Sequence, residues 1–420
     1  MSHRDTVSPA ALSQRDLTLD LARVTAVVFV VIVHLLQVGV GYGPDGAIVT
    51  SRPAEEQPWF DAATWVGQIM PLFFVVGGFA SAAGWASWTA RGGDAGGFVR
   101  SRILRLAQPA LALFVFVAVL LLAASALGLP ASLVDAAAVG VGMPLWFLAA
   151  YVLCQAVVPL AARAHATAPR RTLVVLLGAV VVVDALRFST GVDQLGYLNL
   201  LFVWPLVQQL GFWYRDGWFD RRPAAVLALI SALSYLALWG IVTWGPYSPN
   251  MLANLNPPTL PLVLLGVAQA SLLRLAKPVL TALMRTRIAQ GIVFVIGSRL
   301  MTVYLWHLPV ILLLSGVALL IPGGAPAPAS PAWWATRPVL LVAVLAVLWL
   351  VSLLLVRFER LGGLGSVPSR AVIAVAWICV FAPTFAVTIA GLDTVLAVSG
   401  AVLLGACVVL LRRGRRSTAR

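Results

Sequence analysis

Charged residues are scarce in this sequence, and their scarcity excludes a soluble globular protein. Only 10% of the 420 residues are charged and 61% are hydrophobic. A soluble domain carries roughly 25% charged residues, because it must cover itself with a surface that water tolerates. Lipid is therefore the main solvent of this chain. Since lipid offers no hydrogen bonds, every backbone polar group must be satisfied internally, and without strand-like alternation this predicts helices.

Several signatures of soluble enzymes and metal proteins are also missing. The sequence has no Gly-x-Ser-x-Gly elbow, no P-loop and no His-Glu-x-x-His pair. Its three cysteines, Cys154, Cys379 and Cys407, lie within apolar runs and lack metal-ligand spacing. We therefore expect no metal site. A secretory signal peptide is not recognisable either, because the first apolar run is too long and lacks a small-residue cleavage site, so we expect it to remain as a helix.

The net charge of +14 does not indicate a nucleic-acid partner. Basic residues form no continuous stripe that could follow phosphates. They gather in short clusters between apolar runs, where they orient a membrane protein. The one true run, at residues 412–416, directly follows an apolar segment, and we interpret it as a tail facing anionic lipid.

Twelve apolar runs are long enough to cross about 30 Å of hydrocarbon. They predict an all-α, polytopic transmembrane helical bundle with helices at residues 17–40, 59–88, 109–128, 144–162, 172–188, 198–214, 223–244, 258–276, 291–320, 338–356, 371–390 and 393–411. The run at 291–320 is long enough to tilt or to break.

Arginine alternates along this pattern. The only basic residues in the gaps after odd-numbered helices are Arg52 and Arg337, whereas each gap after an even-numbered helix holds several basic residues. Because basic loops stay in the cytoplasm, the alternation predicts cytoplasmic termini and a location in the inner membrane. The longest gaps on the other side are rich in Gly and Pro, which predicts irregular loops.

Ionisable residues within membrane helices are costly, and so each one is a candidate functional residue. The first helix carries Asp20, Arg23 and His34. Asp20 and Arg23 are three residues apart and can pair. Arg23 and His34 share a face and lie roughly 16 Å apart along the axis. An arginine at the inner mouth can bind a donor phosphate, and a deep histidine can act as a general base. Alternatively, Arg23 snorkels and His34 only bonds a neighbouring helix.

The ninth predicted span adds a polar cluster next to Pro309, which bends a helix. We expect this cluster to line a cavity; its members are Ser298, Thr302, Tyr304 and His307. An aromatic belt at the membrane interface is the alternative, but His307 lies too deep in the run to fit it.

The first cytoplasmic loop carries Arg100, Arg102 and Arg105, which we interpret as donor-binding residues. Arg102 and Arg105 lie one turn apart and can bind the same anion, although charge that merely sets topology is the alternative.

Other polar residues are weaker candidates. Asp184 and Arg187 end the fifth span, and Gln208 lies in the sixth; all three are candidates for lining the same cavity. His3 and His165 fall in predicted cytoplasmic segments, where we expect them to be solvated.

Together these motifs resemble the acyltransferase 3 family of bacterial membrane O-acyltransferases, over roughly residues 15–360. The resemblance depends on motifs that occur in the same order along the chain as in the family. They are Asp20 with Arg23 and His34, then Phe73–Phe79, then Arg102 and Arg105 before Pro109, then Leu145–Leu148, and finally Tyr304–His307 before Pro309.

The resemblance implies a membrane domain at residues 17–360 with a ten-helix core. It would lie between a cytoplasmic tail at 1–16 and two additional helices at 361–411, followed by a basic tail at 412–420. It implies that His34 is the catalytic base or handles the acyl group, with Arg23 also essential. Arg102 and Arg105 would receive an acyl-CoA donor. Gly77 departs from the family, which often has Ser there, so no hydroxyl role falls on that position.

The sequence thus predicts an O-acyltransferase. It would move an acyl group, such as acetyl, from cytoplasmic acyl-CoA to a hydroxyl of a cell-envelope glycan, a glycolipid or a small metabolite. The alternatives are a twelve-helix transporter or exporter and a non-catalytic scaffold. No half repeat supports the transporter, and the deep histidines disfavour the scaffold.

Overall fold

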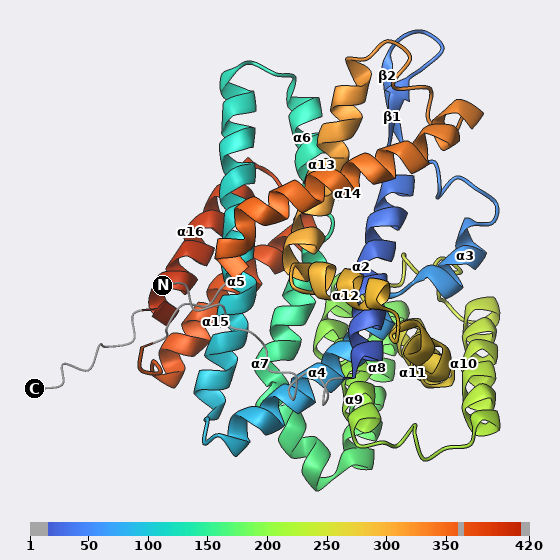
Figure 1. Cartoon of the computed structure of the whole chain (residues 1–420), viewed down its shortest axis with the longest axis vertical. Coiled ribbons are helices and arrows are strands. Elements are labelled where there is room, and N and C mark those ends of the chain that lie inside the picture. The colour runs from blue at the N-terminus through green and yellow to red at the C-terminus, as the bar shows by residue number, and fades with distance from the viewer. Residues whose placement is uncertain (1–15, 360–364, 413–420) are drawn as a thin grey trace, which may run out of the picture.

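The computed structural model describes residues 16–359 and 365–412, and it is almost entirely helical (Figure 1). All but the last residue of the predicted tail at 1–16, nearly all of the basic tail at 412–420, and His3 lie outside these ranges. Twelve helical segments within them are long and apolar enough to cross a membrane, which confirms the predicted fold class.

The spans follow the predicted order. Seven are single helices: α2 (Leu17–Gln37), α5 (Ala95–Ala126), α8 (Pro169–Thr190), α10 (Ala224–Trp244), α11 (Leu260–Leu283), α15 (Arg370–Ala390) and α16 (Thr394–Arg412). Three are broken: α3 (Phe60–Gly67) with α4 (Met70–Ala90), α6 (Ala131–Gly142) with α7 (Leu145–Thr167), and the 3-10 helix η1 (Asp193–Leu201) with α9 (Val203–Arg215). The remaining helices are α12 (Arg287–Gly297), α13 (Leu300–Leu319) and α14 (Pro331–Glu359).

The predicted basic loop before the third span is wrong, because these residues are helical. Asp94 is the N-cap of α5 and accepts a hydrogen bond from the Gly97 backbone N–H, at 2.9 Å. A good cap followed by long unbranched side chains favours helix. Arg102 and Arg105 therefore project from one face of the first turns of α5 rather than from a loop.

The long run at 291–320 breaks, as its length suggested it could. A non-helical residue, Arg299, separates α12 from α13. The short α12 lies across the first half of α2, where Ala289 and Val293 form a small core with Val24 and Met284. Only α13 spans the membrane, so α12 is a short apolar helix covering α2.

A β-hairpin replaces part of the first predicted irregular loop. Its strands are β1 (Gly39–Tyr42) and β2 (Ile48–Ser51), which pair antiparallel. Tyr42 ties the hairpin to the end of α13, because its backbone N–H donates to the Ala325 carbonyl at 3.1 Å and its hydroxyl to the Leu319 carbonyl at 2.9 Å. A side chain at Gly41 would overlap the Pro326 carbonyl. This close approach requires glycine.

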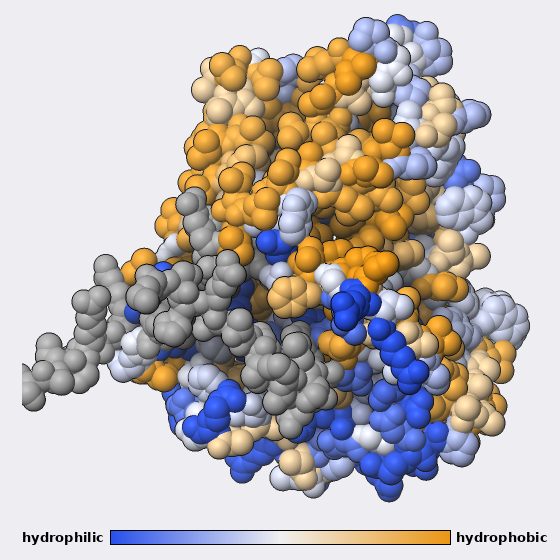
Figure 2. Space-filling view, viewed as in Figure 1, coloured by the Kyte–Doolittle hydropathy of each residue, from blue (hydrophilic) through white to orange (hydrophobic). Residues whose placement is uncertain are grey.

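The two ends of the bundle differ in polarity. The hairpin, the α5–α6 turn and the α13–α14 loop lie at one end, and the α4–α5 and α7–α8 turns lie at the other (Figure 1). The second end is strongly hydrophilic, whereas most of the surface above it is hydrophobic (Figure 2). We call these the arginine-poor and arginine-rich ends, because the turns of the second carry the basic clusters.

Helix α2 lies within the bundle and contacts α4, α11, α12, α13 and α14. Helices α4 and α9 pack closely, because side chains at Gly78 and Gly211 would overlap the backbone of the opposite helix. Helices α15 and α16 pack against α5 and α7 rather than standing apart. The side chains of α2 are thus surrounded by protein on most of its length.

Candidate active site

Two histidines from distant parts of the chain meet inside the bundle. The Nε2 atom of His307 on α13 lies 3.0 Å from the Nδ1 atom of His34 on α2. Their ring centroids are 4.8 Å apart. The His307 side chain has no exposed surface, whereas His34 retains some. The pair therefore combines one enclosed imidazole with one that a ligand can reach.

Backbone carbonyls determine where these rings carry their protons. The Nδ1 atom of His34 lies 3.0 Å from the Val30 carbonyl, and Nδ1 of His307 lies 2.5 Å from the Tyr304 carbonyl. A carbonyl only accepts, so each Nδ1 must donate its hydrogen. In the neutral rings, the single Nδ1–H of His34 is shared between the Val30 carbonyl and Nε2 of His307, and Nε2 of His34 keeps its lone pair. That Nε2 has no partner among the residues the structure describes, so it is available as a general base.

Three arginines gather on the arginine-rich side of this pair. Arg102 lies close enough to both Arg23 and Arg105 to interact with them electrostatically. No ion pair with a carboxylate is found for any of the three within residues 16–359 and 365–412. The Nε atoms of Arg23 and Arg102 are buried without a hydrogen-bond partner there. Like charges with unpaired donors and no counter-ion form a site prepared for an anion.

The Arg102 guanidinium is held in place from two sides. It lies over the Phe98 ring, with Cζ 4.7 Å from the ring centroid. On the other side, a side chain at Gly84 of α4 would overlap its Nη2 atom. The guanidinium thus occupies space that only glycine leaves open.

A row of aromatic rings connects the arginines with the histidine pair. Tyr151 on α7 is within electrostatic range of Arg102. It stacks on Phe147, with ring centroids 5.3 Å apart, and the ring centroids of Phe147 and Tyr304 are 4.7 Å apart. The ring centroids of Tyr304 and His307 are 5.8 Å apart. The Tyr304 hydroxyl donates to the Pro144 carbonyl at 2.5 Å, which fixes this ring where α6 meets α7.

Sequence reasoning missed Tyr151. The Leu145–Leu148 motif pointed to this helix, but no spacing rule links Tyr151 to Arg102, which lies on another helix. The Tyr151 ring also packs beside Gly77, where a Cβ would lie 3.4 Å from it. Glycine at position 77 therefore adjoins a phenol in this chain.

The structure separates the other candidates on α13 and beside it. Thr302 is buried, with 1% of its surface exposed. Ser298 is exposed, and its hydroxyl donates to the Val295 carbonyl, so it caps the end of α12 rather than facing the histidines. The neighbouring Arg299 places its Cζ atom 4.2 Å from the Trp349 ring centroid on α14.

Asp184 and Arg187 belong to a different region. Both carboxylate oxygens of Asp184 are engaged, accepting hydrogen bonds from Asn199, Tyr247 and the Leu260 backbone N–H. Burial and the Asp184 charge raise the pKa of Tyr247, so the phenol stays protonated and donates. Arg187 pairs with Asp193 at 3.0 Å. This network joins α8 to η1 and to the start of α11, and it does not reach the histidine pair.

Arg100, Asp20 and Gln208 also have distinct surroundings. Arg100 donates to the carbonyls of Leu411, Gly365 and Ser366, which attaches α5 to the C-terminal helices and not to a donor. No ion pair joins Asp20 to Arg23 in the part of the chain that the structure describes. Gln208 is 1% exposed, and its Oε1 finds no hydrogen-bond partner within that part.

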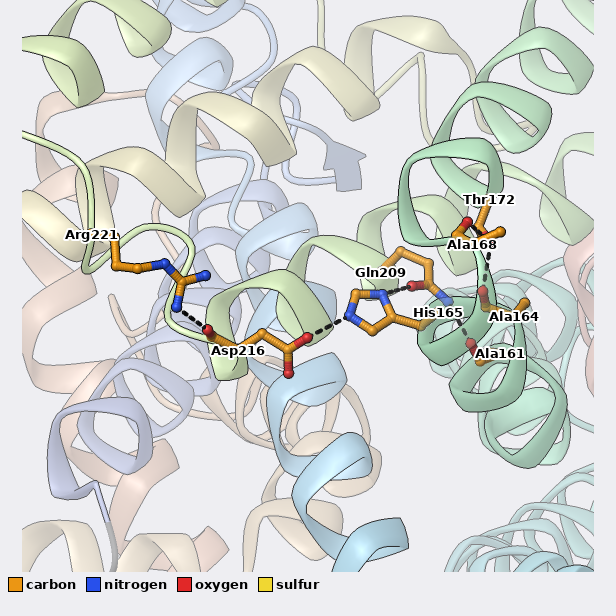
Figure 3. Close-up of polar contacts among 8 residues, drawn as sticks. All are labelled: Ala161, Ala164, His165, Ala168, Thr172, Gln209, Asp216 and Arg221. Atoms are coloured by element: carbon orange, nitrogen blue, oxygen red, sulfur yellow. Dashed lines mark hydrogen bonds and ion pairs between the residues drawn. The ribbon is translucent and has the colours of Figure 1, made fainter.

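His165 is not solvated, which corrects the sequence-based expectation. Its side chain is enclosed between Gln209 of α9 and Asp216, with Nδ1 and Nε2 each 2.9 Å from an oxygen of these residues (Figure 3). Gln209 also donates to Ala161, and Arg221 donates to the Asp216 backbone carbonyl. Helix α7 runs farther toward the arginine-rich end than predicted and brings His165 against α9. The imidazole thus connects α7, α9 and the turn that follows α9.

No group of three or more His, Cys, Asp or Glu side chains within the described ranges could hold a metal ion.

Residues 16–356 match the model of the acyltransferase 3 family, which is described as an acyltransferase domain. The chain belongs to this family. It is thus a multi-pass membrane acyltransferase, an enzyme that transfers groups other than aminoacyl groups. No curated protein and no solved structure matches it. The matched region contains the histidine pair, the three arginines and the aromatic row, and it ends before α15.

Proposed function

We propose that this acyltransferase moves an acyl group from cytoplasmic acyl-CoA to a hydroxyl of a cell-envelope glycan, a glycolipid or a small metabolite. The observation that carries the proposal is the contact between His34 and His307, which leaves Nε2 of His34 as a base without a partner in the described part of the chain. The protein would lie in the inner membrane with both termini in the cytoplasm, because its basic turns gather at one end.

The donor would enter at the arginine-rich end. Acyl-CoA carries its phosphates and its thioester at opposite ends of a long arm. Arg23 and His34 are separated by roughly 16 Å along α2, at 1.5 Å per residue. The phosphates would bind Arg23, Arg102 and Arg105, whose charges have no carboxylate partner among the residues that the structure describes. The arm would then follow the row of Tyr151, Phe147 and Tyr304, which ends beside His307.

The histidine pair would carry out the proton transfer. Nε2 of His34 accepts the hydroxyl proton while the acceptor oxygen attacks the thioester carbonyl carbon. A C–O bond forms, the C–S bond breaks, and the leaving CoA thiolate takes the proton from His34. His307 holds the ring through its Nε2 acceptor, so that the base stays aligned and the imidazolium is stabilised during transfer.

The experiment uses the purified full-length chain in lipid nanodiscs with radiolabelled acetyl-CoA and longer acyl-CoA donors. Released CoA thiol and labelled product are measured with and without an extract of cell-envelope lipids and glycans. The proposal predicts extract-dependent thiol release together with a labelled, ester-linked product. Thiol release from none of the donors would contradict it. Mass spectrometry of envelope lipids and glycans, with and without the gene, would then identify the acceptor.

A further inference from the structure

Arg337 is a buried arginine near the arginine-poor end of the bundle. It lies on α14, six residues after Pro331, and only 9% of its surface is exposed. Arg337 and Arg52 are the only basic residues in the gaps predicted for this side of the membrane. Arginine is disfavoured there and costly within a span, so a buried example requires a partner or a function.

The partners of Arg337 are all neutral. Its Nε atom donates to the Trp333 carbonyl at 3.2 Å, and its Nη2 atom donates to the Thr336 hydroxyl at 2.9 Å. Its Cζ atom lies 4.0 Å from the centroid of the Trp333 ring. No carboxylate lies within ion-pair distance among the residues that the structure describes. The positive charge is therefore oriented by its own helix but not neutralised.

A second unpaired donor lies in the same place. Trp333 has no exposed surface, and its Nε1 is a buried N–H without a partner in the described part of the chain. The Nη1 atom of Arg337 also makes no hydrogen bond there, but it is not fully buried. A buried N–H without a partner is destabilising. One such donor beside an uncompensated cation indicates an acceptor that carries negative charge.

Arg52, the other arginine in the gaps predicted for this side, has very different surroundings. Its side chain is 59% exposed and pairs with Glu55 at 3.3 Å. That pair is a surface contact, because Arg52 is exposed and Glu55 is partly exposed. Arg337 has neither the exposure nor the carboxylate. Its positive charge is therefore available to a bound anion, whereas the charge of Arg52 is already paired.

The surroundings of Arg337 identify the kind of ligand. On the same helix, Val339 and Val342 are 74% and 68% exposed, as expected of residues that face hydrocarbon, but they lie on the opposite face of α14, whereas Arg337 shares the buried face with Trp333. Six residues of helix advance about 9 Å, which places Arg337 near the headgroups at the start of the span. The planar guanidinium matches the oxygens of a phosphate and binds two at once. A phosphate at the depth of the lipid headgroups fits both the charge and the position of Arg337.

We propose that Arg337 and Trp333 bind the phosphate group of a membrane lipid in the leaflet at the arginine-poor end. Two sources of this phosphate exist: the headgroup of an ordinary phospholipid, or a polyprenyl phosphate that carries the acceptor. The second source rests on the proposed function, whereas the site itself does not.

Native mass spectrometry of the full-length protein tests the site without any acyl transfer. The probes are phosphatidylglycerol, a polyprenyl phosphate, and two uncharged lipids of matching chains, diacylglycerol and polyprenol. We expect retention of a phosphate lipid to fall at least tenfold in Arg337→Gln, and severalfold in Trp333→Phe, which keeps the ring but removes the N–H. Arg52→Gln is the matched control and should bind as the wild type does.

The outcomes separate the two sources. Preferential retention of the polyprenyl phosphate supports a site for a lipid-linked acceptor. Equal retention of both phosphate lipids supports a phospholipid headgroup site. Equal binding of either phosphate lipid by the wild type and Arg337→Gln overturns the proposal. Should Arg337→Gln fail to fold, Arg337→Lys replaces it, because lysine keeps the charge but lacks the planar guanidinium. Unchanged retention of the phosphate lipids by both Arg337→Lys and Trp333→Phe would equally overturn the proposal.

Discussion

The Nε2 atom of His307 lies 3.0 Å from Nδ1 of His34, across the contact between α13 and α2. The two residues are 273 positions apart in the chain, and each ring is oriented by a carbonyl of its own helix. His307 is enclosed while His34 is partly exposed, which is why we propose that His307 positions the base and that His34 acts as the base.

Replacing His307 should slow catalysis by misaligning His34. In His307→Ala we expect kcat to fall about 10- to 100-fold, less than the loss of a general base itself, which is about 10²–10⁴-fold. The KM for the donor should change little, because the arginines are untouched. Steady-state kinetics on nanodisc-embedded protein measures both. His165→Ala is the control, since this histidine is also buried but lies in another network. A KM effect without a kcat effect would contradict the positioning role.

The paired substitution Arg102→Ala and Arg105→Ala should raise the donor concentration that is needed. A hydrogen bond to a charged group contributes about 1.5–3 kcal/mol, so the donor KM should rise roughly 10-fold or more. Arg171→Ala, another exposed arginine of the arginine-rich end, serves as the control. Donor dependence that is the same in the double variant and the wild type would remove these residues from the donor site.

Gly84→Ala should weaken donor binding without touching any charged residue. Its Cβ would overlap Nη2 of Arg102 and displace the guanidinium. We expect a severalfold rise in donor KM with normal insertion into the membrane. Gly178→Ala is the matched control, because Gly178 also lies within a membrane helix but has nothing within 4 Å of an added Cβ. An unchanged KM in Gly84→Ala would show that the position of Arg102 does not matter.

Arg100→Ala should reduce stability instead of donor affinity. The change leaves three backbone carbonyls without their donor and removes hydrogen bonds that join α5 to α16 and to the segment before α15. Leu411 is buried, and an unsatisfied buried carbonyl costs about 1–3 kcal/mol, so the thermal unfolding temperature in detergent should fall. The donor KM of the folded fraction should stay at the wild-type value. A raised KM with unchanged unfolding temperature would return Arg100 to the donor site.

Hydropathy and charge predicted most of the fold from the sequence. Membrane spans depend on local composition, so the twelve runs could be counted before any packing was known. Features that depend on contacts could not be predicted in the same way. The start of α5 depends on the Asp94 cap, and the break before α13 depends on how α12 covers α2.

The site was predictable only as separate motifs. Arg23 and His34 share one helix, so helical geometry linked them. His34 and His307 lie far apart in sequence, and no spacing rule could show that they touch. Arg100 and Arg102 are almost adjacent, yet one binds carbonyls of the C-terminal helices while the other faces Arg23. His165 seemed solvated because Gln209 and Asp216, which enclose it, come from a distant helix and its following turn.

The most direct test of the account is acyl transfer by His34→Ala, measured as labelled product formed from acyl-CoA at equal amounts of membrane-inserted protein. Loss of the base at Nε2 should lower transfer by at least about 100-fold, with the donor still bound. Transfer within a few-fold of the wild type would contradict the assignment of His34 as the general base.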